Sequence, residues 1–186
     1  VETAVTRKRN ETSLKYSRAA FQMMLENFSL VLESPDDLPA RGQMLLGAAY
    51  AGTAIEHSML GAAHSAANPL TAHYDVVHGQ AVGMMLPHVV RFNAADETIA
   101  DGYAALVKDT AVASSNGTLS AEALAQAMEA LLDSANLPRD LTAFGVDADQ
   151  LDVLSKEAAQ QWTASFNPRD ITAADFTGLY QKAFAS

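Results

Sequence analysis

The chain has 186 residues, 49% hydrophobic and 18% charged, so it holds enough apolar material for one sizeable core and is expected to form a single domain. Thirty-six alanines against 10 glycines and 6 prolines favour helices and argue against an all-β fold. The net charge of −10 argues against nucleic acid and anionic membranes as partners, and the lack of cysteine excludes disulfides and thiolate metal sites and fits a cytoplasmic protein.

The N-terminal part of the sequence predicts two long helices. Apolar residues from Leu14 to Leu32 recur at helical spacing, with Asn10 or Thr12 available as the N-cap. The turn-forming residues 34–37 end this helix, and Pro39 suits the first turn of a second one.

Residues 42–90 form a segment with little charge that contains every histidine of the chain. The five histidines are His57, His64, His73, His78 and His88. Titratable rings are costly to bury unless they serve a purpose, so this cluster predicts a functional site. The most apolar stretch, residues 42–55, is shorter than the about 20 residues of a membrane span, so the protein is expected to be soluble.

The spacing of the histidines predicts how two of them meet. His57 and His64 are seven residues apart, which puts them on about the same face of one predicted helix, and Pro69 is expected to end that helix. A loop of about eight residues then leads to His78, which starts the next helix. Two helix ends therefore converge and can point His64 and His78 at a common atom.

Imidazole nitrogens in a largely uncharged pocket suit Fe²⁺ or Zn²⁺, which need one or two further ligands. Glu56 and Asp75 are the only acidic residues in the segment and thus the local candidates. For any single histidine, a structural role in the core stays an alternative. His88 follows Pro87 on an apolar helix and is expected to be structural.

The second half of the chain predicts further capped helices and no strand. Three helices are expected, each with capping residues ahead of it: Ser120 before residues 124–132, Asp147 with Gln150 before residues 151–162, and Thr172 with Asp175 before residues 176–184. The total is about seven helices joined by short turns, which predicts an all-α, bundle-like fold.

Several short motifs resemble those of iron-containing (group III) alcohol dehydrogenases. The motifs are Gly61-Ala-Ala-His64, Asn68-Pro69, His78-Gly79, Leu86-Pro87-His88, Phe92-Asn93 and Asn167-Pro168-Arg169. They span nearly the whole chain. The resemblance implies the C-terminal helical half of a two-domain enzyme in which the other, α/β domain binds NAD or NADP.

The resemblance also implies a ligand set. The family holds a divalent metal, Fe²⁺ with Zn²⁺ as the alternative, through an aspartate and three histidines. By motif, the last two histidines fall on His64 and His78, and the first two ligands would lie just upstream of Val1. Residues 1–186 are therefore expected to be a metal-binding domain cut from a longer protein, with removal of an initiator methionine as the alternative.

Two positions depart from the family pattern and leave the proton path open. Asn68 stands where many members carry a further histidine, and Thr71-Ala72 replace a Gly-Gly pair. Asn68 is still able to donate a hydrogen bond to a substrate oxygen. His73 is a candidate for part of the proton relay.

The implied activity is the interconversion of a small-molecule alcohol with its aldehyde or ketone, with the metal as Lewis acid and the dinucleotide as hydride carrier. The chain alone is expected to be inactive. Glycerol dehydrogenases, maleylacetate reductases and dehydroquinate synthases are alternatives with the same architecture. A stand-alone helical interaction module is an alternative of another class, and a homo-oligomer is compatible with the sequence.

Overall fold

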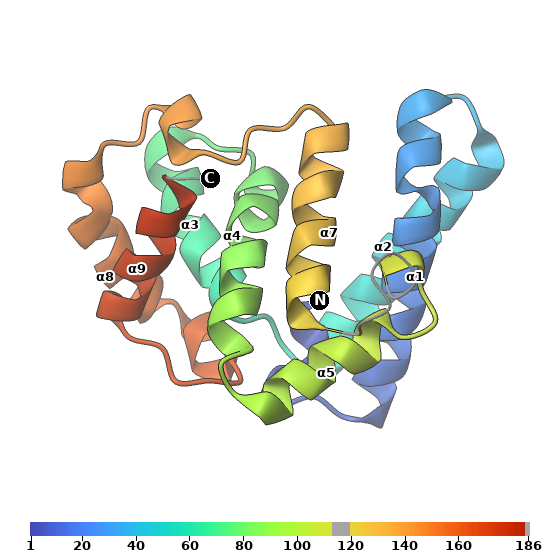
Figure 1. The fold of residues 1–186 in the computed structure, drawn as a ribbon, viewed down its shortest axis with the longest axis horizontal. Helices are drawn as coiled ribbons and strands as arrows, with labels where there is room; N and C mark the ends of the chain where they lie inside the picture. Colours follow the sequence, from blue (N-terminus) through green and yellow to red (C-terminus); the bar gives the residue numbers. More distant parts are fainter. Residues whose placement is uncertain (113–119, 185–186) are drawn as a thin grey trace.

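The computed structural model describes residues 1–112 and 120–184, which form eight α-helices and four short 3-10 turns without a strand (Figure 1). The helices are α1 (Glu11–Glu33), α2 (Leu38–His57), α3 (Ala62–Tyr74), α4 (His78–Asn93), α5 (Glu97–Val107), α7 (Ala121–Ser134), α8 (Leu151–Gln160) and α9 (Ala173–Ala183). The turns are η1 (Glu2–Ala4), η2 (Leu141–Phe144), η3 (Ala148–Gln150) and η4 (Trp162–Phe166). The predicted all-α fold is confirmed. No described helix is long and apolar enough to cross a bilayer.

Most predicted capping residues start the helices to which they were assigned. Asn10 accepts a hydrogen bond from the backbone of Ser13 at the start of α1, and Ser120 does the same for Ala123 in α7. Thr172 and Asp175 form the expected capping box of α9. These local hydrogen bonds satisfy N–H groups that a helix leaves free at its first turn.

The prediction for Asp147 is wrong. Its side chain caps no helix, because the turn η3 separates it from α8. The predicted helix is also too long, since Trp162 lies beyond the end of α8, in η4.

The main core lies between α3, α4, α8 and α9, which pack side by side on the left of Figure 1. Its largest fully buried side chains include Leu70, Met84, Met85, Phe176 and Tyr180. A second cluster joins α4 to α5 and α7, and the α1–α2 hairpin extends to the right. Each large buried apolar side chain contributes about 1.5–3 kcal/mol. The start of α3 and the start of α4 are therefore carried by a firmly packed scaffold.

The chain around His64 differs from the prediction. His57 and His64 do not share a helix, because α2 ends at His57 and α3 begins only at Ala62. Pro69 does not end α3, which runs on to Tyr74, so only residues 75–77 link α3 to α4.

Packing explains why Pro69 is accepted inside α3. A proline in a helix costs about 3 kcal/mol. Ala66, Ala67 and Leu70 around it are completely buried, and the Tyr180 hydroxyl donates to the carbonyl of Ala66 at 2.7 Å. The core contacts outweigh the local cost, and the helix ends instead at Asp75, which has a left-handed φ of 52°.

His88 is buried in α4, as expected of a structural residue, with 7% of its surface exposed. Burial, and after it the nearby positive charge of Arg91, lower the pKa of its imidazole from 6.5 to about 4. The charge of Glu129 raises this pKa, whereas the charges of Lys182 and Arg139 lower it.

This shifted pKa predicts loss of stability in acid. As the pH falls below 6.5, His88 takes up a proton in the unfolded chain but stays neutral in the folded one until about pH 4. We expect this residue to lower the free energy of unfolding by about 2–3 kcal/mol between pH 7 and pH 4.5. Urea unfolding at pH 7 and pH 4.5 would measure the free energy of unfolding of the wild-type protein and of His88→Gln, which lacks the titrating ring. Equal pH dependence in the two proteins would contradict the prediction.

Candidate metal centre

His64 and His78 lie next to each other where α3 and α4 begin. Their ring centroids are 5.5 Å apart and the ring planes are inclined by 56°. A metal bound at about 2.0–2.1 Å from a ring nitrogen lies about 3 Å from the ring centroid, so two rings on one ion have centroids within roughly 6 Å. The 5.5 Å between the two centroids lies within that range. His78 is exposed and the side chain of His64 is 22% exposed, so an ion could reach both.

The part of the chain that the structure describes supplies no third ligand. No group of three or more histidine, cysteine, aspartate or glutamate residues gathers within it. Glu56 and Asp75 therefore do not join His64 and His78 in such a group, and the local carboxylate ligand that the sequence suggested is not formed by these residues. A divalent transition metal needs four or more ligands in most sites, and this pair can provide only two of them.

The carboxylate that meets His64 comes from Glu2, in turn η1. Oε2 of Glu2 lies 2.5 Å from Nδ1 of His64, and Oε1 accepts the backbone N–H of Ala63 at 2.7 Å. Sequence reasoning missed this contact because the two residues are 62 positions apart and belong to no common motif. The available signal was the resemblance, which implies that two ligands lie just upstream of Val1 and so places the start of the chain near the metal.

Asn68 and His73 occupy different parts of α3. Asn68 is one turn after His64, and its amide donates to Oε1 of Gln161 at 2.9 Å. His73 is nine residues after His64, which is about 13.5 Å along the helix axis, and its Nε2 lies 2.8 Å from Oε2 of Glu157. The structure thus places Asn68 near the histidine pair and His73 apart from it.

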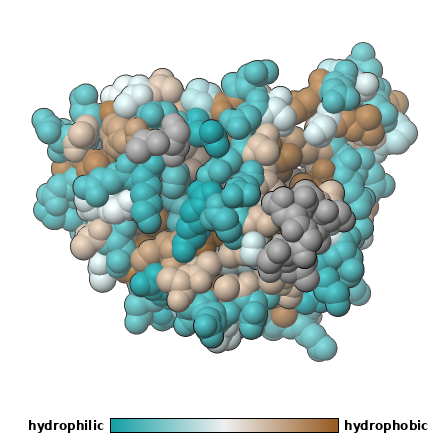
Figure 2. Space-filling model, viewed as in Figure 1, coloured by the Kyte–Doolittle hydropathy of each residue, from teal (hydrophilic) through white to brown (hydrophobic). Residues whose placement is uncertain are grey.

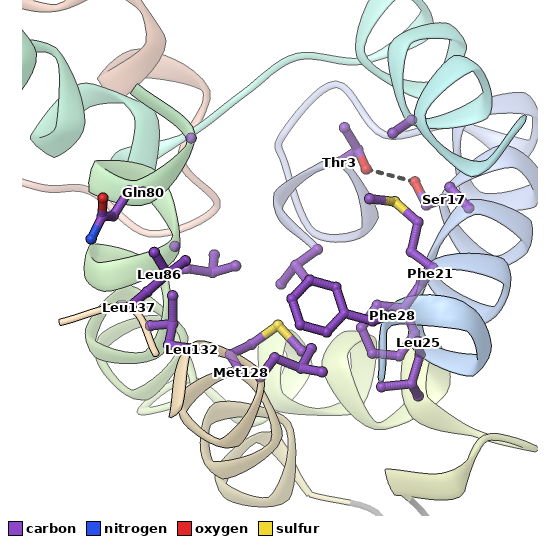
Figure 3. A pocket seen from close by; sticks show the side chains of 17 residues that line it. Thr3, Ser17, Phe21, Leu25, Phe28, Gln80, Leu86, Met128, Leu132 and Leu137 are labelled. Carbon is purple, nitrogen blue, oxygen red and sulfur yellow. Dashed lines mark hydrogen bonds between the residues drawn. The ribbon is translucent and has the colours of Figure 1, made fainter. Parts of the chain in front are cut away.

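An apolar pocket of about 400 Å³ lies beside the start of α4 (Figure 3). Phe21, Leu25 and Phe28 on one side face Met128 and Leu132 on the other. Apolar surface also shows between α7 and the α1–α2 hairpin in the space-filling view (Figure 2). The described lining includes Gly79 and Gln80, the two residues after His78, but no acidic, basic or histidine side chain. The pocket therefore offers mainly apolar contacts.

The chain matches known proteins over nearly its full length. Residues 1–184 match the model of the Fe-containing alcohol dehydrogenase family, C-terminal part. Lactaldehyde reductase of Escherichia coli K12 is 31% identical over 150 residues, which cover 80% of this chain and 39% of that protein. The 1,3-propanediol dehydrogenase of Klebsiella pneumoniae is 26% identical over 186 residues, which cover 99% and 48%.

The solved structure of an alcohol dehydrogenase from Oenococcus oeni has the same fold. It superimposes with a TM-score of 0.87 at 24% identity, over 98% of this chain and 48% of that one. The predicted all-helical fold of the family's C-terminal part is therefore confirmed. The chain spans about half or less of the length of these relatives.

Proposed function

Because the chain belongs to the iron-containing alcohol dehydrogenase family, we propose that it is the metal-binding helical part of an NAD(P)-linked enzyme that interconverts an alcohol and an aldehyde or ketone. The observation that carries the proposal is the His64–His78 pair, with ring centroids 5.5 Å apart. The pair fits one ion and leaves room for ligands from outside the described residues. Two ligands and the dinucleotide-binding domain are proposed to precede Val1.

The residues of this chain have distinct proposed roles. Nε2 of His64 and a ring nitrogen of His78 hold the ion, for which Fe²⁺ is the first candidate and Zn²⁺ the second. A divalent ion held there would supply Lewis acidity to the oxygen of the substrate. Two imidazoles are neutral ligands, so they add no negative charge to the ion.

Asn68 is proposed to position the substrate. One N–H of its amide is used by Gln161, and a primary amide has two. The second N–H, one turn after His64, is available to the substrate oxygen. The role of His73 in a proton relay stays a prediction. Its Nε2 is hydrogen-bonded to Glu157, away from the histidine pair.

The stand-alone interaction module fits this geometry less well. Histidines with a purely structural role are expected to be buried with their ring nitrogens bonded to the backbone. His64 instead meets the carboxylate of Glu2, and His78 is exposed. The two ring centroids are 5.5 Å apart, a distance that two ligands of one ion can have.

Activity of the complete protein tests the proposal. We expect NAD(P)⁺ reduction, followed by absorbance, with at least one short primary alcohol or diol, and loss of more than about 90% of the rate after the metal is removed. Adding back Fe²⁺ or Zn²⁺ should restore it, while Ca²⁺, which prefers oxygen ligands, serves as the control. A metal-free enzyme that keeps its full rate would overturn the proposal, as would a lack of activity with every alcohol and aldehyde tested.

A further inference from the structure

We propose that Glu2 is a positioning residue for the metal centre, because its buried carboxylate fixes the ring of His64 with Nε2 directed away from Glu2. This inference rests on the proposed function, in which His64 is a metal ligand. Glu2 is only 6% exposed, which is unusual for an acidic residue and calls for partners that compensate the burial.

The carboxylate has two partners that both need an acceptor. Nδ1 of His64 lies 2.5 Å from Oε2, and the N–H of Ala63 donates to Oε1. A carboxylate only accepts hydrogen bonds, so Nδ1 carries the proton and the lone pair of the neutral ring lies on Nε2. Metal-binding histidines commonly have such a carboxylate partner, which fixes both the tautomer and the ring orientation.

The same carboxylate also holds the helix turn that carries His64. The N-cap residue Gly61 has no side chain to cap α3, and the first N–H groups bond outside the helix instead. Ala63 donates to Glu2, and Ala62 points to Oδ1 of Asn167 at 3.4 Å. The negative charge is also favoured at a helix N-terminus.

Glycine at position 61 allows this arrangement. An added Cβ would lie 3.0 Å from Oε1 of Glu2 and 3.2 Å from Oδ1 of Asn167, closer than ordinary contacts. Glu2 and Asn167 therefore approach the start of α3 at a place where any side chain would displace them. Gly61 is needed for close approach and not for an unusual backbone angle.

A buried amide pair holds Asn167 in turn. Asn93 and Asn167 are each 1% exposed and exchange two hydrogen bonds, of 2.8 and 3.1 Å. Asn93 also donates to the hydroxyl of Tyr103 in α5, and Asn167 donates to the carbonyl of Arg169. The Phe92-Asn93 and Asn167-Pro168-Arg169 motifs, which contribute no ligand, thus support the helix start at which His64 is positioned.

Glu2→Gln in the complete protein is the direct test. Glutamine keeps the shape of the side chain but replaces one carboxylate oxygen by an NH₂ donor, so its two ends cannot accept from Ala63 and His64 as the two oxygens of Glu2 do. We expect the affinity for Zn²⁺, measured by competition with a chromophoric chelator, to fall about 10–100-fold. Ser17→Ala is the matched control. It removes a buried 2.7 Å hydrogen bond to Thr3 in the same turn, η1, without contacting His64, and should change the affinity less than about twofold.

A second measurement determines the tautomer of His64 and requires neither bound metal nor a substituted protein. In the metal-free wild-type protein labelled with ¹⁵N-histidine, the ring of His64 should be the Nδ1–H tautomer. An Nε2–H tautomer would overturn the proposal. It would also be overturned if folded Glu2→Gln kept the wild-type affinity for Zn²⁺ while His64→Ala lost the metal. If His64→Ala keeps its metal, the proposed metal centre fails instead, so the two failures are distinguishable.

Discussion

Replacing His64 or His78 by alanine in the complete protein is expected to lower its metal content from about one ion per chain to about a tenth of that or less. A site with three or four ligands that loses one of them binds its ion far more weakly. The two rings lie close enough to share one ion, so either substitution should have the same effect. Elemental analysis after gel filtration in metal-free buffer measures the content directly.

Two other histidines provide controls for that experiment. His57→Ala should keep the metal, because His57 is exposed at the end of α2 and belongs to a different helix from His64. His88→Ala should also keep it but lose about 1–3 kcal/mol of stability, since it leaves a cavity in the core. Metal contents equal to wild type in both His64→Ala and His78→Ala would refute the assignment of the ligands.

The 186-residue chain by itself is expected to bind Zn²⁺ or Fe²⁺ about 1,000-fold or more weakly than the complete protein. A four-ligand zinc site is worth about 10–16 kcal/mol, and the described residues offer only half of such a site. We also expect no tight binding of NAD(H), because Gly47, Gly52 and Gly61 lie in or beside helices and form no strand–turn–helix phosphate loop.

Calorimetric titration of the isolated chain measures both affinities, and circular dichroism would first establish that the chain is helical. Adding the upstream segment should restore metal and dinucleotide binding together. Tight, stoichiometric NAD(H) binding by the isolated chain would place the cofactor site within these residues and would favour the stand-alone alternative.

Local sequence determined those features that depend on neighbouring residues. The starts of α1, α7 and α9 follow from Asn10, Ser120 and Thr172, because a capping side chain bonds N–H groups two or three positions away. Met84 and Met85, in the apolar, low-charge segment, likewise lie in the core. The motifs around His64 and His78 predicted the family, which the match over residues 1–184 confirmed.

Tertiary structure decided where local preference and packing disagree, and which distant residues meet. Pro69 should end a helix on local grounds, but the buried contacts of Ala66, Ala67 and Leu70 exceed the cost of about 3 kcal/mol. The sequence predicted a local carboxylate ligand at Glu56 or Asp75, whereas the carboxylate that contacts His64 belongs to Glu2. No helical or strand period relates residues 62 positions apart, so only the packing of η1 against the start of α3 brings that carboxylate to the ring.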